Sequence, residues 1–314
     1  MTEKGKKISD TRDNDQVLII GADSLIGGAL SESLKRSGKN VLGTSRRMEA
    51  RLEDKIFLDL EQEISFNRLP ENISVAFFCA AFNSLEYCRC ESVKTTRVNV
   101  DQTVKLAERL AQSGTFVVFL STNLVFDGTV PFVKADAPLC PQTEHGRQKA
   151  EAEKRILGLG SLSSVVRLTK IFGPDMRLLQ GWIESLQNKK VIHPFSDKVV
   201  SPLPLSLVIE VLSRVAEQRP SGIIQVSGER DITYAQLVSR LAEKMGTDLK
   251  LVQPIPSQTS RMFLEHLPRY TTLDTTRLVH DLGVKVPNTK TTVDLILDQN
   301  LATDYLASSL KEEG

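Results

Sequence analysis

The chain has 314 residues, of which 40% are hydrophobic and 25% are charged, an ordinary composition for a globular protein. Lys and Arg number 40 and Asp and Glu number 39, so the net charge of +1 argues against nucleic acid or an anionic membrane as the main partner. No run approaches the roughly 18 apolar residues of a membrane span. The length suffices for one large domain or two moderate ones.

The N-terminal segment and the cysteines indicate where the protein resides. Residues 1–15 are polar and charged without an apolar centre, which excludes a secretory signal and predicts a disordered tail. All four cysteines are expected as reduced thiols of a cytoplasmic protein. Cys88 and Cys90 are too close together for the usual pair of zinc ligands, and no histidine cluster accompanies them, so no metal is expected.

Apolar runs alternate with amphipathic helical patterns along the first half of the chain. Strands are expected at residues 16–20, 41–44, 55–59, 75–79, 115–121 and 164–168, and helices at 25–37, 91–112 and 148–157. Because these strands are continuously apolar, both faces of the sheet are expected to be covered. The pattern predicts an α/β fold with a doubly wound, Rossmann-like parallel sheet.

The pattern becomes less regular after about Pro174. Further elements are expected as a strand and two helices, at residues 223–227, 233–244 and 292–310. We expect residues 16–174, with returning segments, to form a nucleotide-binding domain, and residues 175–314 mainly to form a smaller domain that caps it.

The first predicted strand runs through a glycine turn into a helix, an arrangement that binds pyrophosphate. Gly21 permits the turn, and Gly27 permits close packing of the helix on the strand. Ser24 replaces the middle glycine of a GxxGxxG loop and brings both bulk and a hydroxyl donor. A plain strand–helix turn without a ligand is the alternative. The expected contacts with the cofactor are Gly21, Asp23, Ser24, Leu25, Ile26 and Gly27.

The second strand ends where a site for NAD usually places an acid for the ribose 2′-hydroxyl. Arg46 and Arg47 stand there instead and suit a 2′-phosphate, so NADP (NADPH) is the expected cofactor, with two solvated surface arginines as the alternative. Asp59 is placed to accept from the adenine amine, although an Asp at a strand end can equally be a cap. Ser45 and Leu60 flank these positions and complete this part of the site.

Four segments together indicate a family. Residues 79–88 form an alanine-rich strand end, residues 97–99 begin a central helix, residues 120–128 read LSTNLVFDG, and residues 273–283 carry a C-terminal signature. They resemble the extended short-chain dehydrogenase/reductase family, and more closely its dTDP-4-dehydrorhamnose reductase-like branch, over nearly all of residues 16–300. The resemblance implies a C-terminal substrate-binding domain, an NADP-binding first domain, and cofactor contacts by Cys79, Ala80 and Ala81.

The resemblance also implies a catalytic set of a Ser or Thr, a Tyr, and a Lys that holds the nicotinamide ribose. Thr122 matches the hydroxyl and Lys149 matches the lysine, but His145 stands at the tyrosine position of the YxxxK pattern. The family's Asp after the threonine is Asn123 here. We expect Asn123 and Phe126 to face the substrate.

His145 is the main departure from the family's chemistry. An imidazolium is a competent general acid, and the i, i+4 spacing keeps His145 on one helix face with Lys149. However, its ring nitrogen reaches roughly 2 Å less far than a phenol oxygen, and the cationic Lys149 should keep it neutral near pH 7. A water relay could bridge the gap. The alternative is a polar helix residue that faces an emptied site.

Two functions are consistent with these features. The first is an NADP-dependent oxidoreductase of the 4-keto-reductase type, acting on a nucleotide-linked keto-sugar through Thr122, His145 and Lys149. The second is a catalytically silent dinucleotide-binding subunit that regulates or assembles with another enzyme; the regulatory β-subunit of methionine adenosyltransferase resembles the same branch. The expected partners are a nucleotide-sugar-like small molecule and either further copies of the chain or a partner enzyme.

Overall fold

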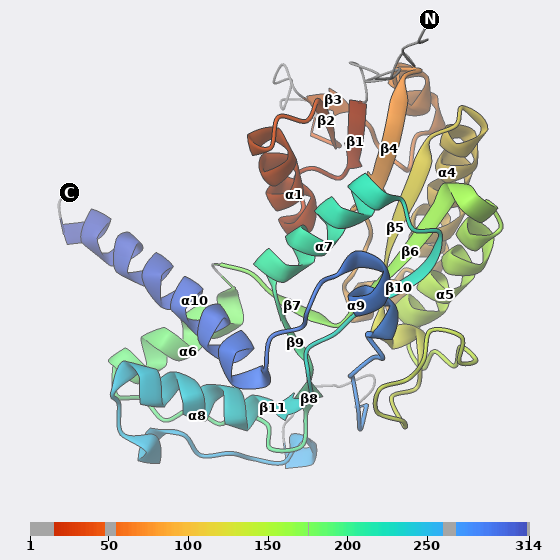
Figure 1. Ribbon diagram of the computed structural model, residues 1–314. Coiled ribbons are helices and arrows are strands. Elements are labelled where there is room, and N and C mark those ends of the chain that lie inside the picture. Colours follow the sequence, from red (N-terminus) through yellow and green to blue (C-terminus); the bar gives the residue numbers. More distant parts are fainter. Residues whose placement is uncertain (1–15, 48–54, 175, 260–267, 313–314) are drawn as a thin grey trace, which may run out of the picture.

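The computed structural model describes residues 16–47, 55–174, 176–259 and 268–312 (Figure 1), so the tail predicted for residues 1–15 lies outside the described residues. Seven parallel strands form one sheet in the order β10-β6-β5-β4-β1-β2-β3. The strands are β1 Gln16–Ile20, β2 Val41–Ser45, β3 Lys55–Phe57, β4 Ile73–Phe78, β5 Phe116–Thr122, β6 Ser163–Leu168 and β10 Gly222–Val226. The predicted doubly wound, Rossmann-like sheet is confirmed.

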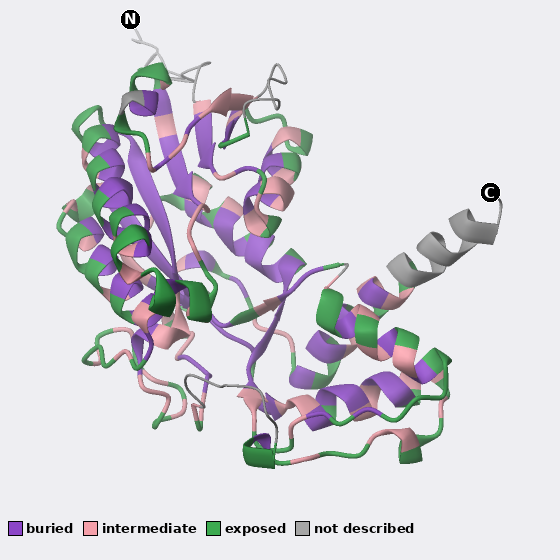
Figure 2. Ribbon diagram, turned by 180° about the vertical axis from the view of Figure 1, so that it is seen from behind, coloured by how far each residue is buried: buried purple, intermediate pink, exposed green. Residues whose placement is uncertain are grey.

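Helices cover both faces of this sheet. Successive side chains of a strand point to opposite faces, so alternate residues of each strand pack against different helices. Val17 and Ile19 of β1 pack into one hydrophobic cluster, whereas Leu18 and Ile20 pack into another. The first cluster includes α1 Leu25–Arg36, α7 Leu205–Gln218 and α9 Thr276–Leu282, and the second includes α4 Thr103–Gln112 and α5 Glu144–Leu157. In Figure 2 the buried strands are accordingly purple, and the outer faces of the helices are green.

Two helices differ from their expected form. The helix predicted over 91–112 follows α2 Leu85–Cys90 and consists of α3 Ser92–Thr96, a π-helical turn over Arg97–Gln102, and α4. Helix α5 begins four residues before its predicted start, because Thr143 caps it by accepting a hydrogen bond of 3.0 Å from the Gly146 amide. His145 therefore lies in the first turn of α5.

A smaller group of helices lies below and to one side of the sheet in Figure 1 and has its own hydrophobic cluster. It contains α6 Arg177–Gln187, α8 Tyr234–Met245 and α10 Thr289–Glu312, next to the short strand pairs β7 Lys170–Phe172 with β9 Pro202–Pro204 and β8 Val199–Val200 with β11 Ile232–Thr233. Because β10 and α7 return to the large sheet, the chain crosses between the two parts more than once. The domain boundary at residue 174 stays a prediction. None of the described helices is both long and apolar enough to cross a membrane.

Candidate functional site

The turn between β1 and α1 leaves no room for side chains at its two key glycines. Gly21 has a φ of +87°, and a β-carbon there would lie 2.7 Å from the β-carbon of Ala80. A β-carbon at Gly27 would lie 2.3 Å from the carbonyl oxygen of Gly21. Both positions therefore require glycine for the observed backbone. Gly21 has a left-handed conformation, and at both positions another part of the chain lies too close for a side chain.

Ser24 caps α1 from within this turn. Its hydroxyl accepts a hydrogen bond of 3.1 Å from the Gly27 amide and donates one of 2.8 Å to the Gly21 carbonyl. Because a hydroxyl has a single proton, this donor is used inside the loop and is not directed at a phosphate. The amides of Leu25 and Ile26, the first two residues of the helix, have no acceptor within the helix, so they suit an anion.

A pocket of about 310 Å³ extends from the glycine turn along the segments that follow β2, β3 and β4. Its lining contains most of the expected cofactor residues: Gly21, Asp23, Ser24, Ser45, Arg46, Arg47, Asp59, Leu60, Cys79, Ala80 and Ala81. It also contains residues that the sequence did not single out: Ile20, Thr44, Leu58, Glu61, Phe82, Asn83 and Val98. The pocket is thus elongated along the carboxyl ends of the strands, where open α/β sheets bind their ligands.

Asp23 forms a charged cluster at one end of this pocket. Its carboxylate accepts a hydrogen bond from the Ser45 hydroxyl and lies 3.1 Å from the ammonium of Lys55. The Ser45 hydrogen bond and then Lys55 hold the pKa of Asp23 below its usual value, so the carboxylate is charged. Lys55 partly neutralises this charge next to the exposed Arg46 and Arg47. Sequence reasoning missed Lys55, because nothing local distinguishes it from a surface lysine.

Asp59 lines the pocket, but its carboxylate already serves the backbone. One oxygen accepts a hydrogen bond of 3.0 Å from the Glu61 amide, and the other accepts one of 3.1 Å from the Gln62 side chain. Asp59 therefore stabilises the turn after β3, but it is not the cap of a helix, because Gln62 stands at the N-cap of the helical turn Glu63–Arg68. Its contact with adenine stays a prediction.

A larger cavity of about 970 Å³ adjoins the first pocket, and Ser24, Cys79 and Asn83 line both. Of the predicted residues it is further lined by Leu25, Ile26, Thr122, Asn123 and His145. Sequence reasoning missed other lining residues, among them Lys170, Lys198, Tyr234, Pro268 and Thr271. Lys170 follows the end of β6 closely, which is a signal for a ligand-facing position, but the others come from distant segments without such a signal.

Thr122 and His145 face this cavity from β5 and α5. The Thr122 hydroxyl accepts a hydrogen bond of 3.2 Å from the Leu124 amide, and its proton has no acceptor among the described residues. His145 is only 6% exposed, and its Nδ1 lies 3.8 Å from the Cys88 sulfur. Burial, followed by the charge of Lys149, lowers the pKa of His145 to about 4. The expected neutral imidazole is confirmed, although burial rather than Lys149 is the larger cause.

Lys149 is buried and is not among the residues that line the cavity. Its ammonium donates a hydrogen bond of 2.8 Å to the Leu120 carbonyl and lies 4.4 Å from the centroid of the Phe119 ring. Burial lowers the pKa of Lys149 to about 8, and burial also raises the pKa of the nearby Cys79 thiol to about 12. The contact of Lys149 with a nicotinamide ribose stays a prediction, and it requires the ammonium to share or leave the Leu120 carbonyl.

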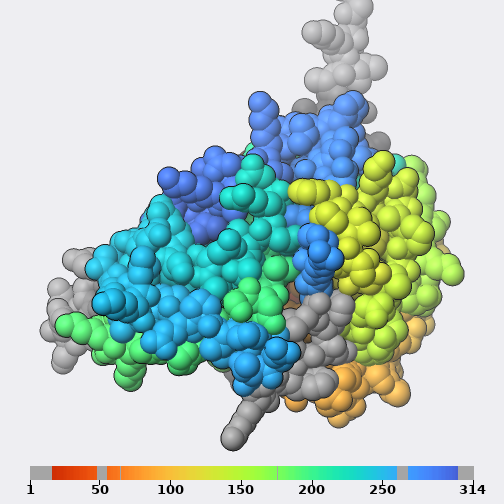
Figure 3. Space-filling model, turned by 90° about the horizontal axis from the view of Figure 1, so that it is seen from below, coloured from red at the N-terminus to blue at the C-terminus, as the bar shows by residue number. Residues whose placement is uncertain are grey.

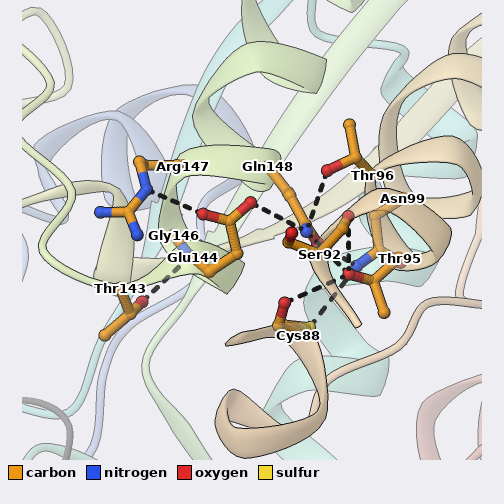
Figure 4. A network of polar contacts seen from close by, with 10 residues as sticks. All are labelled: Cys88, Ser92, Thr95, Thr96, Asn99, Thr143, Glu144, Gly146, Arg147 and Gln148. Atoms are coloured by element: carbon orange, nitrogen blue, oxygen red, sulfur yellow. Dashed lines mark hydrogen bonds and ion pairs between the residues drawn. The ribbon is translucent and has the colours of Figure 1, made fainter. Parts of the chain in front are cut away.

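A network of polar side chains fixes helix α5 against the π-helical turn (Figure 4). The Asn99 amide nitrogen donates to the Gln148 side chain at 2.8 Å and to the Phe82 carbonyl at 2.9 Å, and its oxygen accepts from the Phe82 amide at 2.8 Å. Gln148 in turn donates to the Thr95 hydroxyl at 2.9 Å. These bonds join α5 to the loop after β4 that lines both the pocket and the cavity.

Phe126 lies outside the cavity lining, in a small hydrophobic cluster with Val125 and Leu273. The guanidinium of Arg167 lies 4.9 Å from the centroid of its ring. Viewed from below in Figure 3, yellow residues that follow β5 lie beside blue residues of the C-terminal part of the chain. A β-bridge between Val133 and Leu273 joins these two parts. Phe126 thus packs within this region, and its contact with a substrate stays a prediction.

Comparison with known proteins adds to this geometry. The model of the RmlD substrate binding domain family matches residues 15–302. Among curated proteins, methionine adenosyltransferase 2 subunit beta of Bos taurus is 26% identical over 287 residues, which cover 86% of this chain and 83% of that protein.

Two solved structures have the same fold. The dTDP-4-dehydrorhamnose reductase of Bacillus anthracis in complex with NADP aligns with a TM-score of 0.79 at 16% identity, covering 91% of this chain and 99% of that chain. MoeE5 in complex with UDP-glucose and NAD aligns with a TM-score of 0.73 at 22% identity, covering 90% and 98%. Since the family model spans most of the sequence, the chain belongs to the RmlD substrate binding domain family.

Proposed function

We propose that the chain binds NADP(H) along the glycine turn and acts as a slow oxidoreductase on a nucleotide-linked keto-sugar in the adjoining cavity. The observation that carries the proposal is the continuity of the two sites, because Ser24, Cys79 and Asn83 line both. A dinucleotide along the first pocket would bring its hydride donor to the cavity that Thr122 and His145 face. The two similar structures, one in complex with NADP and the other with UDP-glucose and NAD, support these ligand classes.

The preference for NADP rests on the charges at the end of β2. Arg46 and Arg47 line the pocket, and charge-assisted bonds to a 2′-phosphate contribute about 1.5–3 kcal/mol each. Asp23 would repel that phosphate, but its pairing with Lys55 reduces the repulsion. The cluster is therefore positive overall, as a 2′-phosphate requires.

The slow rate follows from the protonation state of His145. Thr122 has a hydroxyl proton free to hydrogen-bond a substrate oxygen, but transfer of a proton from His145 needs the imidazolium. With a pKa of about 4, that form is scarce at pH 7. A neutral imidazole can still polarise a carbonyl through a hydrogen bond, which is weaker assistance than proton transfer from a well-placed acid, worth about 10²–10⁴ in rate.

A second candidate is a dinucleotide-binding regulatory or assembly subunit. It is favoured by the 26% identity to methionine adenosyltransferase 2 subunit beta of Bos taurus, a protein named as a subunit of an enzyme. In this role the glycine turn would bind the dinucleotide to stabilise or regulate the protein. The replacement of the family's tyrosine by His145 would then not impair function, because no proton transfer is needed.

The two candidates differ in one assay. NADPH oxidation by the purified chain is measured with dTDP-4-keto-6-deoxyglucose, next to a Thr122→Val variant. The oxidoreductase predicts slow turnover, well below an ordinary enzyme rate of about 10 s⁻¹, that falls further in Thr122→Val. Binding of NADPH without any turnover that depends on Thr122 would favour the subunit, and absence of dinucleotide binding would contradict both.

A further inference from the structure

Asn123 offers an unused side-chain amide to the larger cavity. It directly follows Thr122 at the end of β5 and begins the helical turn Asn123–Val125, and both residues line the cavity. The backbone carbonyl of Asn123 accepts a hydrogen bond of 3.1 Å from the Phe126 amide, which holds the turn in place. No described residue forms a hydrogen bond with the Asn123 side chain. This amide is therefore available to a ligand of the cavity.

Buried amides elsewhere in the chain use both of their N–H groups within the protein. Asn99 donates to a backbone carbonyl at 2.9 Å and to the Gln148 side chain at 2.8 Å. Asn300 donates to two backbone carbonyls, at 2.9 and 3.0 Å. These amides stabilise the fold, because a buried polar group without a partner is costly. Asn123 is only partly buried and has no such structural role, which leaves its donors to the cavity.

An amide at this position has a different hydrogen-bonding character from the aspartate of the family pattern. An ionised carboxylate only accepts hydrogen bonds and carries a negative charge, whereas an amide is neutral and has two N–H donors. The Thr122 hydroxyl beside it also has a proton without an acceptor in the described part of the chain. The end of β5 therefore brings two neutral donors together, next to a cavity wall where an aspartate would repel a developing negative charge.

We propose that Asn123 and Thr122 form an oxyanion hole, in which the amide and the hydroxyl both donate hydrogen bonds to the carbonyl oxygen of the substrate. When a hydride from NADPH reaches the carbonyl carbon, the electron pair of the C=O π bond moves to this oxygen, and the two donors stabilise its negative charge. The step oxidises NADPH to NADP⁺, and the oxygen takes its proton from solvent, so neither residue loses one. This inference rests on the proposed function and adds Asn123 to it as a catalytic residue.

The test compares Asn123→Ala and Asn123→Asp with the native chain in single-turnover NADPH oxidation with dTDP-4-keto-6-deoxyglucose. Loss of one oxyanion-hole donor typically lowers the rate about 10²–10³-fold, so Asn123→Ala is expected to fall by about 10². Asn123→Asp keeps the shape but adds a negative charge beside the oxyanion, and it should fall at least as far. The affinity for NADPH should stay unchanged in both variants. Asn72→Asp, at an exposed asparagine outside both linings, is the matched control and should keep the native rate.

A second measurement needs no turnover. The same keto-sugar, labelled with carbon-13 at its carbonyl, is bound together with NADP⁺, and infrared difference spectroscopy gives the stretching frequency of the carbonyl. Hydrogen bonds from Asn123 and Thr122 should lower this frequency relative to the free ketone, and Asn123→Ala should reverse part of the shift.

Three results would overturn the oxyanion hole: no bound ketone in the native chain, a bound ketone with the frequency of the free one, or an unchanged frequency in the folded Asn123→Ala variant. An unchanged rate in Asn123→Ala would equally overturn the catalytic role of Asn123. A lowered frequency that depends on Asn123, in a native chain without turnover, would refute the proposed oxidoreductase and leave Asn123 as a donor to the ketone.

Discussion

His145 controls the proton chemistry of the site through its burial. Three neighbours affect the imidazole. The Cys88 sulfur lies near Nδ1, a hydrogen bond with the Phe82 backbone raises the pKa of His145, and the charge of Lys149 lowers it. Burial outweighs the contribution of Phe82, so the neutral form dominates at physiological pH. The residue identity was evident in the sequence, but its burial and the Cys88 contact were not, because Cys88 is 57 residues away in the chain.

The pKa of His145 makes the stability of the fold depend on pH. The unfolded chain binds a proton at His145 below about pH 6.5, while the folded chain resists protonation down to about pH 4. The free energy of unfolding should therefore fall as the pH drops from 6.5 to 4, by about 3 kcal/mol from this group. Denaturant unfolding across this range checks the effect. His145→Gln should flatten the profile, while the exposed control His193→Gln should retain it.

Restoring the family's tyrosine is expected to give little rescue. His145→Tyr supplies the phenol, but the position is buried beside Cys88, and Asn123 on the cavity wall also departs from the family pattern. NADPH oxidation with a dTDP-keto-sugar should rise by less than the 10²–10⁴ expected of a well-placed acid. A native chain that turns over this substrate at about 10 s⁻¹ would contradict the account of His145.

Cofactor preference should follow the charges at the end of β2. The native chain is expected to bind NADP more tightly than NAD, and the double change Arg46→Ala with Arg47→Ala should erase most of the preference. Lys55→Gln leaves Asp23 without its ion pair and should weaken NADP about tenfold while affecting NAD little. Calorimetry with both cofactors checks this, with the exposed Lys39→Gln as control. Equal affinity of the native chain for NAD and NADP would refute the preference.

At the scale of elements, the sequence predicts regular strands and helices well and irregular ones poorly. The strand at 16–20 is found as predicted, since a continuous apolar run suffices to define a strand covered on both faces. The start of α5 was missed because residues 144–147 have no apolar periodicity, and the Thr143 cap sets it instead. The π-helical turn was missed because its apolar spacing differs little from that of an α-helix, although it positions Asn99 against Phe82.

The β1–α1 turn gives the most direct test of an element. Gly27→Ala adds a β-carbon 2.3 Å from the Gly21 carbonyl, so α1 must move away from β1 and its first amides leave their positions. Dinucleotide binding should be abolished, as measured by calorimetry on a folded variant. Gly181→Ala, in a helix where a β-carbon meets nothing within 4 Å, is the matched control and should bind as the native chain does. Normal binding by Gly27→Ala would place the dinucleotide elsewhere.

At the scale of the whole molecule, the larger cavity is assembled from segments that are distant in sequence. Thr122 comes from the sheet, His145 from a helix that covers it, and Lys198 and Tyr234 from the smaller group of helices and short strands. Motifs could reveal the parts near the glycine turn and on α5, because these follow the family pattern. The opposite wall depends on tertiary packing alone, so no local pattern marked Lys198 or Tyr234 as ligand-facing.

The central claim is that the glycine turn binds NADPH although the family's proton donor is gone. Calorimetric titration of NADPH into the native chain tests it most directly. We expect saturable binding at one site per chain, tighter than that of NADH, because the pocket, the free amides of α1 and the two arginines are all present. Absence of saturable NADPH binding by the folded native chain would contradict the account.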